Sequence, residues 1–290
     1  MPLTKDRLLS LPEHVETRTV TDTTLMLYAL SVGMGAQPAE LDFVLERGLR
    51  AVPSVATVIG YHDAWLDPAG VPLAQVFHAA QALTLHRPLP VSGAVEVRNR
   101  LVGGVDKGPG RPALLFQETM IAPAGGGPAF VTGLSTLFVR DGGGMGGDFG
   151  RPAPVVHAVP DTAPASRHAI ATRPDQALLH RLLGDRNPLH ADPEAAAAAG
   201  FPAPILHGAC TFGIACAALL REICGLDPAR LASIEARFVG PVFPGERLEC
   251  ALWPAPDGRA DAVAFRLSAP ERAATILDAG RATLRPAAGQ

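Results

Sequence analysis

The stretch CTFGIACAALLREIC, from Cys210 to Cys224, decides the fold that we expect for this chain. Hydrophobic residues surround nearly the whole circumference of the helix it would form, and such a helix is buried rather than surface-lying. The segments that follow read as strands, because several alternate apolar and polar residues. They are 231–240, 246–254, 261–269 and 276–286. The pattern predicts a buried helix wrapped by an antiparallel sheet.

The first half of the chain repeats this order of elements. Each half has a strand, a short capped helix, an irregular loop and a longer apolar helix, followed by further strands. Pro53 corresponds to Pro204 and Pro88 to Pro241, at shifts of 151 and 153 residues. Such long shifts indicate a duplication rather than a short-period solenoid. A buried helix wrapped by a sheet is the hot-dog arrangement. We therefore expect an α+β double hot dog, with a generic α+β duplication as the alternative.

A Gly/Pro-rich stretch separates the two halves. It has almost no periodic apolar pattern, which is typical of a linker. We predict an N-terminal unit over 1–140, a linker over 141–164 and a C-terminal unit over 165–290. The linker contains a literal GxGxxG at 142–147, but a Pro-rich stretch follows it instead of the helix that a dinucleotide site requires.

Composition excludes several classes of function. The chain has 290 residues, 48% of them hydrophobic and 18% charged, with a formal net charge of −3. No basic excess indicates nucleic acid or an anionic membrane as a partner. The N-terminal residues lack the apolar stretch of a signal peptide, and no run approaches the ~20 apolar residues that span a bilayer. We expect a cytoplasmic protein.

The four cysteines are Cys210, Cys216, Cys224 and Cys250, and none forms a CxxC pair with another. All four lie in the second half, three of them in one apolar segment. This distribution favours free thiols in a reducing compartment over disulfides.

A polar loop precedes the predicted helix. Asp185, Asn187 and His190 lie close together in GDRNPLHADPEAAAAAGFPAPILHG, which runs from Gly184 to Gly208. Pro188 blocks a continuous helix between the acid and the histidine, so a loop gathers these groups. The first half of the chain lacks this constellation at the corresponding positions. A purely structural need of the fold would place such residues in both copies, so the loop predicts chemistry in the second half.

Several motifs together resemble the MaoC-like hydratase 2 family, the (R)-specific 2-enoyl-CoA hydratases. The resemblance spans nearly the whole chain. Two departures stand out: His180 replaces the family's usual Tyr or Phe, and HAAQ at 78–81 replaces HGEQ. The matching stretches are YALSVGMG, VFHAAQALTLHRPLPVSG, DKGPG, HRLLGDRNPLHADPEAA and PILHGACTFG.

The reaction of this family suits the residues of the loop. Hydration of a trans-2-enoyl thioester needs an activated water at C3, a proton for C2 and a donor for the thioester oxygen. Asp185 and His190 can hold one water between a carboxylate and an imidazole, and Asn187 can orient it without competing for the proton. Gly208 precedes the buried helix, so its free N–H favours negative charge. The resemblance implies the same roles: a catalytic Asp185–His190 pair and an oxyanion donor at Gly208.

The resemblance also implies contacts with the coenzyme A thioester. No cofactor is expected, because the thioester is itself the substrate. Pairing of hot-dog sheets favours a homodimer, although the duplication already satisfies that pairing within one chain. The residues expected to line the acyl pocket or to contact the ligand are His78, Ala79, Lys107, Arg186, Pro188, Leu189 and Phe238.

Alternatives remain for the residues and for the function. Asp185, His190 and His207 lack a convincing metal-ligand pattern, so no metal is expected, and His207 is interpreted as a structural contact at the helix entrance. Asp192, before Pro193, is interpreted as a helix N-cap. Hot-dog folds host several reactions, so an acyl-CoA thioesterase and a non-catalytic acyl-CoA binding module are the competing functions.

Overall fold

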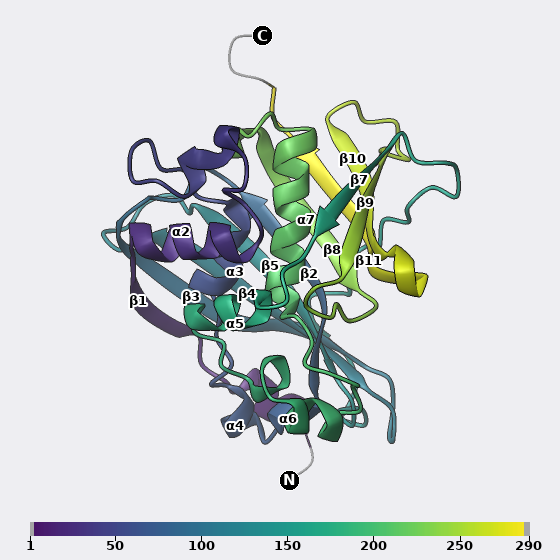
Figure 1. Cartoon of the computed structure of the whole chain (residues 1–290). Helices are drawn as coiled ribbons and strands as arrows, with labels where there is room; N and C mark the ends of the chain where they lie inside the picture. Colours follow the sequence, from purple (N-terminus) through teal and green to yellow (C-terminus); the bar gives the residue numbers. More distant parts are fainter. Residues whose placement is uncertain (1–2, 287–290) are drawn as a thin grey trace.

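An eleven-stranded antiparallel sheet forms the frame of the molecule in the computed structural model, which describes residues 3–286 (Figure 1). The order is β1-β3-β4-β5-β2-β8-β11-β10-β9-β7, and β6 pairs with β3. The bounds are β1 His14–Val20, β2 Val76–Leu85, β3 Gly93–Asp106, β4 Ala113–Pro123, β5 Val131–Val139, β6 Phe149–Gly150, β7 Ser166–Ala171, β8 Leu231–Phe238, β9 Arg247–Pro254, β10 Ala262–Ala269 and β11 Ala274–Leu284.

The two halves of the chain meet inside this sheet. β1 to β6 come from the first half and β7 to β11 from the second. β2 pairs with β8 in register from Ala80↔Arg237 to Thr84↔Ser233, so one continuous sheet serves both units. This is the double hot-dog arrangement that the repeat predicts. The unit boundaries at 140 and 165 stay a prediction.

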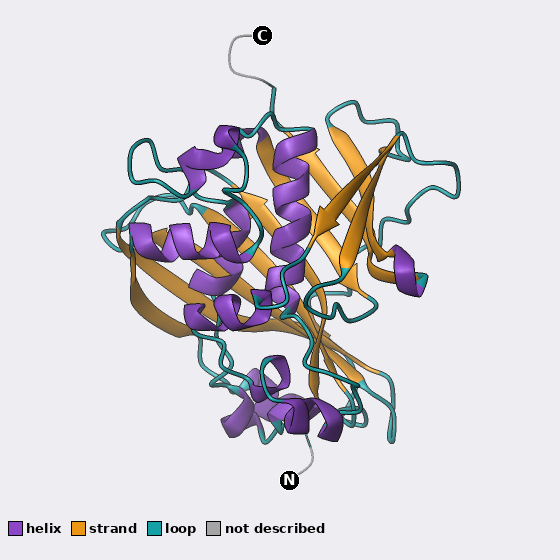
Figure 2. Ribbon diagram, viewed as in Figure 1, coloured by secondary structure: helices purple, strands orange, loops and turns teal. Residues whose placement is uncertain are grey.

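The helices pack mainly on one side of the curved sheet (Figure 2). They are α1 Lys5–Leu9, α2 Asp22–Ser31, α3 Ala56–Ile59, α4 Leu66–Ala69, α5 Gln176–His180, α6 Pro193–Ala198 and α7 Gly208–Glu222. The short 3-10 helices are η1 Pro38–Phe43, η2 Pro53–Val55, η3 Leu73–Gln75, η4 Arg181–Leu183, η5 Pro188–His190, η6 Pro228–Arg230 and η7 Pro270–Arg272.

The predicted central helix of the second unit is confirmed. Every residue of α7 from Cys210 to Leu220 is buried, as its all-round hydrophobicity predicts. The four cysteines are free and buried. The predicted N-cap is also present, because the Asp192 side chain accepts a hydrogen bond from the Glu194 N–H at the start of α6.

The central helix predicted for the first unit is much shorter than expected. The corresponding segment forms only η2 and α3, and the helix ends before Gly60. A Cβ on Gly60 would lie 2.5 Å from Thr119 Cγ2 on β4, so the backbone here lies against the sheet as it turns away. The helix therefore leaves part of the first unit's sheet without a helical cover.

The Gly-rich linker is folded around one carboxylate. Asp106, at the end of β3, accepts hydrogen bonds from the N–H groups of Gly108, Gly144, Gly146 and Gly147 at 2.6–3.1 Å. These four donors hold the pKa of Asp106 down at about 2. The three linker glycines have φ angles of 81–106°, which other residues rarely adopt. The GxGxxG stretch thus serves this turn, and no helix follows it.

Gly213 lets α2 approach α7 closely. A Cβ at this position would lie 2.5 Å from both Tyr28 Oη and Val32 Cγ1. We expect Gly213→Ala to lower the free energy of unfolding by about 1 kcal/mol, because overpacking by ~1–3 kcal/mol outweighs the ~1 kcal/mol gain in helix propensity. Urea unfolding measures this, with Gly125→Ala, whose Cβ would meet nothing within 4 Å, as the control. Equal or higher stability of Gly213→Ala would contradict the close packing.

Candidate active site

A cavity of about 670 Å³ lies between the two units, and both contribute to its wall. The first unit supplies residues of β2, β4 and β5 and the segment that follows α3. The second unit supplies the polar loop, the start of α7 and the chain after β8. Of the predicted site residues, this wall contains His78, Asp185, Asn187, Leu189, His190, Gly208 and Phe238.

The polar loop is held in shape by its own side chains. The Asp185 carboxylate accepts a hydrogen bond from the Asn187 N–H at 3.1 Å. Asn187 in turn accepts from the Leu189 N–H at 3.0 Å and caps η5. The bond from Leu189 uses one lone pair of the Asn187 side-chain oxygen, so its second lone pair and its NH₂ group remain to orient a water or a substrate.

His190 presents one defined nitrogen to the cavity side of the loop. Its Nδ1 lies 2.8 Å from the Ile205 carbonyl oxygen, which can only accept, so Nδ1 carries the proton. In the neutral ring Nε2 is then an acceptor, the form required of a base. Burial lowers the pKa of His190 below its ordinary value, while the Asp185 carboxylate opposes the shift. A carboxylate oxygen of Asp185 and one ring nitrogen each of His190 and His207 all lie within 4.8 Å of one another.

His207 supports this pair from behind. Its Nε2–H donates to the Asp185 backbone carbonyl at 3.2 Å, and its ring stacks on His190 with centroids 3.8 Å apart. This confirms the predicted structural contact at the helix entrance. His180 packs 4.9 Å from the His207 ring and hydrogen-bonds to Ser31 Oγ at 3.0 Å. The residue that departs from the family pattern thus lines the cavity and packs against His207.

Gly208 begins α7 and faces two of the predicted pocket residues. A Cβ there would lie 3.5 Å from Phe238 Cε1 and 3.7 Å from His78 Nδ1. Among residues 3–286, no backbone or side-chain acceptor takes the Gly208 N–H. The His78 and Phe238 rings pack with centroids 4.7 Å apart, and burial lowers the pKa of His78 to about 4. An anion at this point would meet a free N–H and the positive end of a helix.

Four predicted ligand contacts lie outside the cavity wall. Lys107 is exposed in the loop after β3, and Ala79 occupies a bulge of β2 between His78 and Ala80. Arg186 and Pro188 belong to the polar loop but do not line the cavity. The roles of these residues, like those of the predicted catalytic set, stay predictions.

The sequence analysis missed several polar residues of the cavity wall. They occupy strands or the segment after α3, where a polar residue at period two looks like a solvent-facing one, so no local signal marks them. They are Arg18, Tyr61, His62, Asp63, Gln117, Thr119 and Ser135. Gln81 also lines the cavity and lies in the HAAQ stretch that the sequence analysis singled out.

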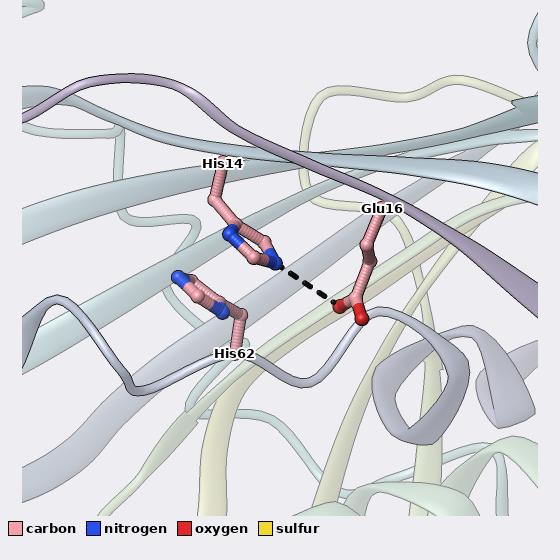
Figure 3. A group of neighbouring side chains, drawn as sticks. All are labelled: His14, Glu16 and His62. Atoms are coloured by element: carbon pink, nitrogen blue, oxygen red, sulfur yellow. Dashed lines mark ion pairs between the residues drawn. The ribbon is translucent and has the colours of Figure 1, made fainter.

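A second cluster consists of His14, Glu16 and His62, whose side chains are drawn in Figure 3. His62 is part of the cavity wall. The two imidazole rings stack with centroids 3.9 Å apart and planes 11° from parallel, and His14 Nε2 lies 3.4 Å from Glu16 Oε1. Parallel rings direct their lone pairs side by side rather than at one point, so this conformation favours packing over metal chelation. Arg18 pairs with Glu16 at 2.5 Å and donates to the carbonyl of Tyr61 at 2.7 Å, which fastens the cavity-lining segment to β1.

The histidines predict how stability depends on pH. Burial lowers the pKa of His207 to about 4 and that of His180 to about 3, below the unfolded value near 6.5. The unfolded chain therefore binds more protons below about pH 6.5, so the free energy of unfolding is fully present above that pH and falls as pH drops towards 3. Urea unfolding at about pH 7 and about pH 5 measures the slope. His180→Phe is expected to flatten it, and an unchanged slope would contradict this assignment.

Comparisons with known proteins agree with this fold. Residues 155–262 match the family model described as MaoC like domain, and residues 19–141 match the MFE-2 hydratase 2 N-terminal domain. The chain is 39% identical over 246 residues to 3-hydroxyacyl-thioester dehydratase Y of Mycobacterium tuberculosis, covering 83% of this chain and 84% of that protein. It is 37% identical over 248 residues to enoyl-CoA hydratase ChsH3 of the same organism, with 82% and 84% covered. The crystal structure of a MaoC-like dehydratase from Phytophthora capsici has a TM-score of 0.86 at 30% identity and 98% coverage of both chains.

Together, the fold, the site and these relatives define a double hot-dog enzyme of the hydro-lyase class. Among the described residues, no helix has the length and hydropathy needed to cross a bilayer. The chain belongs to the MaoC-like hydratase 2 family.

Proposed function

We propose that the chain catalyses the reversible, (R)-specific hydration of trans-2-enoyl-CoA to (3R)-hydroxyacyl-CoA. The observation that carries the proposal is the presence of Asp185, His190 and the free N–H of Gly208 in the wall of one cavity. The names of the two mycobacterial relatives, an enoyl-CoA hydratase and a hydroxyacyl-thioester dehydratase, describe the two directions of such a reaction.

The residues divide the chemistry between them. A water held between the Asp185 carboxylate and His190 Nε2 loses a proton to this pair as its oxygen bonds to C3. The pair returns a proton to C2, so one water adds across the double bond. Positioned proton transfer of this kind contributes ~10²–10⁴ in rate. The charge that develops on the thioester oxygen is received by the Gly208 N–H at the start of α7.

The same geometry supports a single stereochemical outcome. Both groups that activate water come from the second unit, in the loop before α7, so water reaches C3 from one face of the bound double bond. A homodimer, a cytoplasmic location and coenzyme A contacts by Ala79, Lys107, Arg186 and Pro188 belong to the proposal as predictions from the sequence.

Crotonyl-CoA tests the proposed reaction. Hydration removes the enoyl absorbance without releasing free thiol, and chiral analysis should identify the (3R) product. Release of thiol would establish the thioesterase instead. Binding without turnover would establish a non-catalytic acyl-CoA module.

Removal of metal ions is expected to leave this activity unchanged. The pair needs no Lewis acid, because a carboxylate and a neutral imidazole together activate the water. Turnover of crotonyl-CoA after exhaustive dialysis against a chelator, compared with undialysed enzyme, measures this. Loss of activity that added Zn²⁺ restores would instead assign Asp185, His190 and His207 to a metal centre.

A further inference from the structure

A row of polar side chains crosses the floor of the cavity in the first unit. Gln81 on β2, Ser135 on β5 and Gln117 on β4 are direct cross-strand partners, so they share one face of the sheet. Thr119, two residues along β4, faces the same way. All four line the cavity, among apolar neighbours such as Leu137.

This polar floor is open because the first unit's central helix is short. In the second unit α7 covers the sheet, whereas α3 stops at Ile59. Gln81 and Gln117 are only 5% and 6% exposed, so their polar groups lie far from bulk solvent. Every side-chain polar atom of Gln81 and Gln117 has at least one hydrogen-bond partner within the protein, so a ligand can use only the donors and lone pairs that these bonds leave free.

The hydrogen bonds within the floor leave a defined set of groups free. Ser135 donates to Gln81 Oε1 at 2.8 Å, and Thr119 donates to Asn99 Oδ1 at 2.6 Å, so the lone pairs of both hydroxyl oxygens remain available. Gln81 gives one of its two N–H donors to Ala82 O at 3.0 Å and keeps the other. Gln117 uses both of its N–H donors, on His62 O and Asn99 Oδ1.

These free groups are matched by a neutral hydroxyl. A hydroxyl donates to one of the two free oxygens and accepts from the Gln81 N–H. A carboxylate only accepts and would face the lone pairs of Ser135 and Thr119. Arg18 in the cavity wall is already paired with Glu16 and does not offset that repulsion.

The position of the floor fits the far part of an acyl chain. The thioester end lies at Gly208, whose Cβ position is 3.5 Å from Phe238 at the end of β8. From β8 the strand order runs through β2 and β5 to β4, three steps of about 4.8 Å, or about 14 Å in all. The floor therefore extends from near the reacting carbons to the distal end of a medium-length chain.

We infer that the floor formed by Gln81, Thr119, Gln117 and Ser135 is a subsite for a hydroxyl group carried on the distal acyl chain. The inference rests on the proposed function and specifies its substrate class, namely hydroxylated medium-chain enoyl-CoA thioesters. A plain alkyl chain of the same length offers no partner to the remaining N–H of Gln81 or to the lone pairs of the Ser135 and Thr119 hydroxyls.

Binding of saturated thioesters tests the subsite separately from the chemistry. Calorimetry with ω-hydroxydecanoyl-CoA and decanoyl-CoA is expected to show about tenfold tighter binding of the hydroxylated ligand. Equal binding, or tighter binding of decanoyl-CoA, would overturn the inference. Failure of the proposed function is a separate result, because it would appear as the absence of crotonyl-CoA hydration while this binding ratio is retained.

Substitutions on the floor test whether its residues cause the tighter binding of the hydroxylated ligand. Ser135→Ala and Thr119→Val each remove a hydroxyl at nearly constant shape and are expected to reduce the binding ratio, the double variant to about one. Ser233→Ala is the matched control, because Ser233 bonds to Thr283 on β8 and β11 and does not line the cavity. Circular dichroism verifies folding of each variant. An unchanged ratio in folded Ser135→Ala and Thr119→Val would place the preference elsewhere and contradict the inference.

Discussion

Asp185→Asn is expected to lower kcat for crotonyl-CoA hydration by about 10²–10⁴-fold, with little change in stability. Asparagine keeps the shape of aspartate and an oxygen that accepts the Asn187 N–H, so the loop keeps its hydrogen bond. It does not take a proton from water. His190→Ala is expected to cause a similar loss, and the double variant should lose little more, because the two residues act as one unit.

Asp192→Asn supplies the matched control for this prediction. It makes the same chemical change in the same loop, but Asp192 caps α6 and does not line the cavity. Its kcat should remain close to that of the parent enzyme, and steady-state kinetics with circular dichroism compares the four variants with the parent. Near-normal turnover in both Asp185→Asn and His190→Ala would overturn the assignment of the catalytic pair.

Gly208→Pro is expected to reduce kcat by about 10²–10³-fold, because it deletes the N–H that receives the thioester oxygen. Proline is well accepted at the first position of a helix. His207, which precedes it, has φ −58° and ψ 141°, an extended conformation that residues before proline prefer. The substitution therefore removes the donor and leaves the start of α7 compatible with the fold.

Gly208→Ala separates the donor from the effect of added volume. Alanine keeps the N–H, and its Cβ would make only ordinary contacts with Phe238 and His78. We expect its kcat to fall by less than about tenfold, measured beside Gly208→Pro with the same substrate. Equal losses in the two variants would show that bulk, rather than the missing donor, limits turnover.

The sequence predicts the second unit better than the first for a physical reason. α7 is hydrophobic on all sides, and only a buried helix explains such a segment. The matching stretch after Pro53 has the same apolar character, yet the chain leaves the helix at Gly60 to lie against Thr119. Gly60 is a local signal for the end of a helix, but its contact with Thr119 is tertiary and is not visible in the sequence pattern.

In the candidate site, too, residues close in sequence could be predicted, whereas residues that only the fold brings together could not. Asp185 and His190 are close in sequence and share one loop, so their pattern was visible without coordinates. Gln81, Ser135 and Gln117 come from three strands, and only the register of those strands makes them a row. Lys107 is a different case, because the family resemblance suggests a ligand contact for a residue that lies outside the cavity wall, and its role stays a prediction.

The pairing of β2 with β8 has a consequence for any attempt to divide the chain into its two halves. Both strands lie in the interior of the sheet, and each would become a bare edge if the halves were separated. An exposed edge of this length invites aggregation. We therefore expect each half, expressed alone, to aggregate rather than to fold as an independent soluble module.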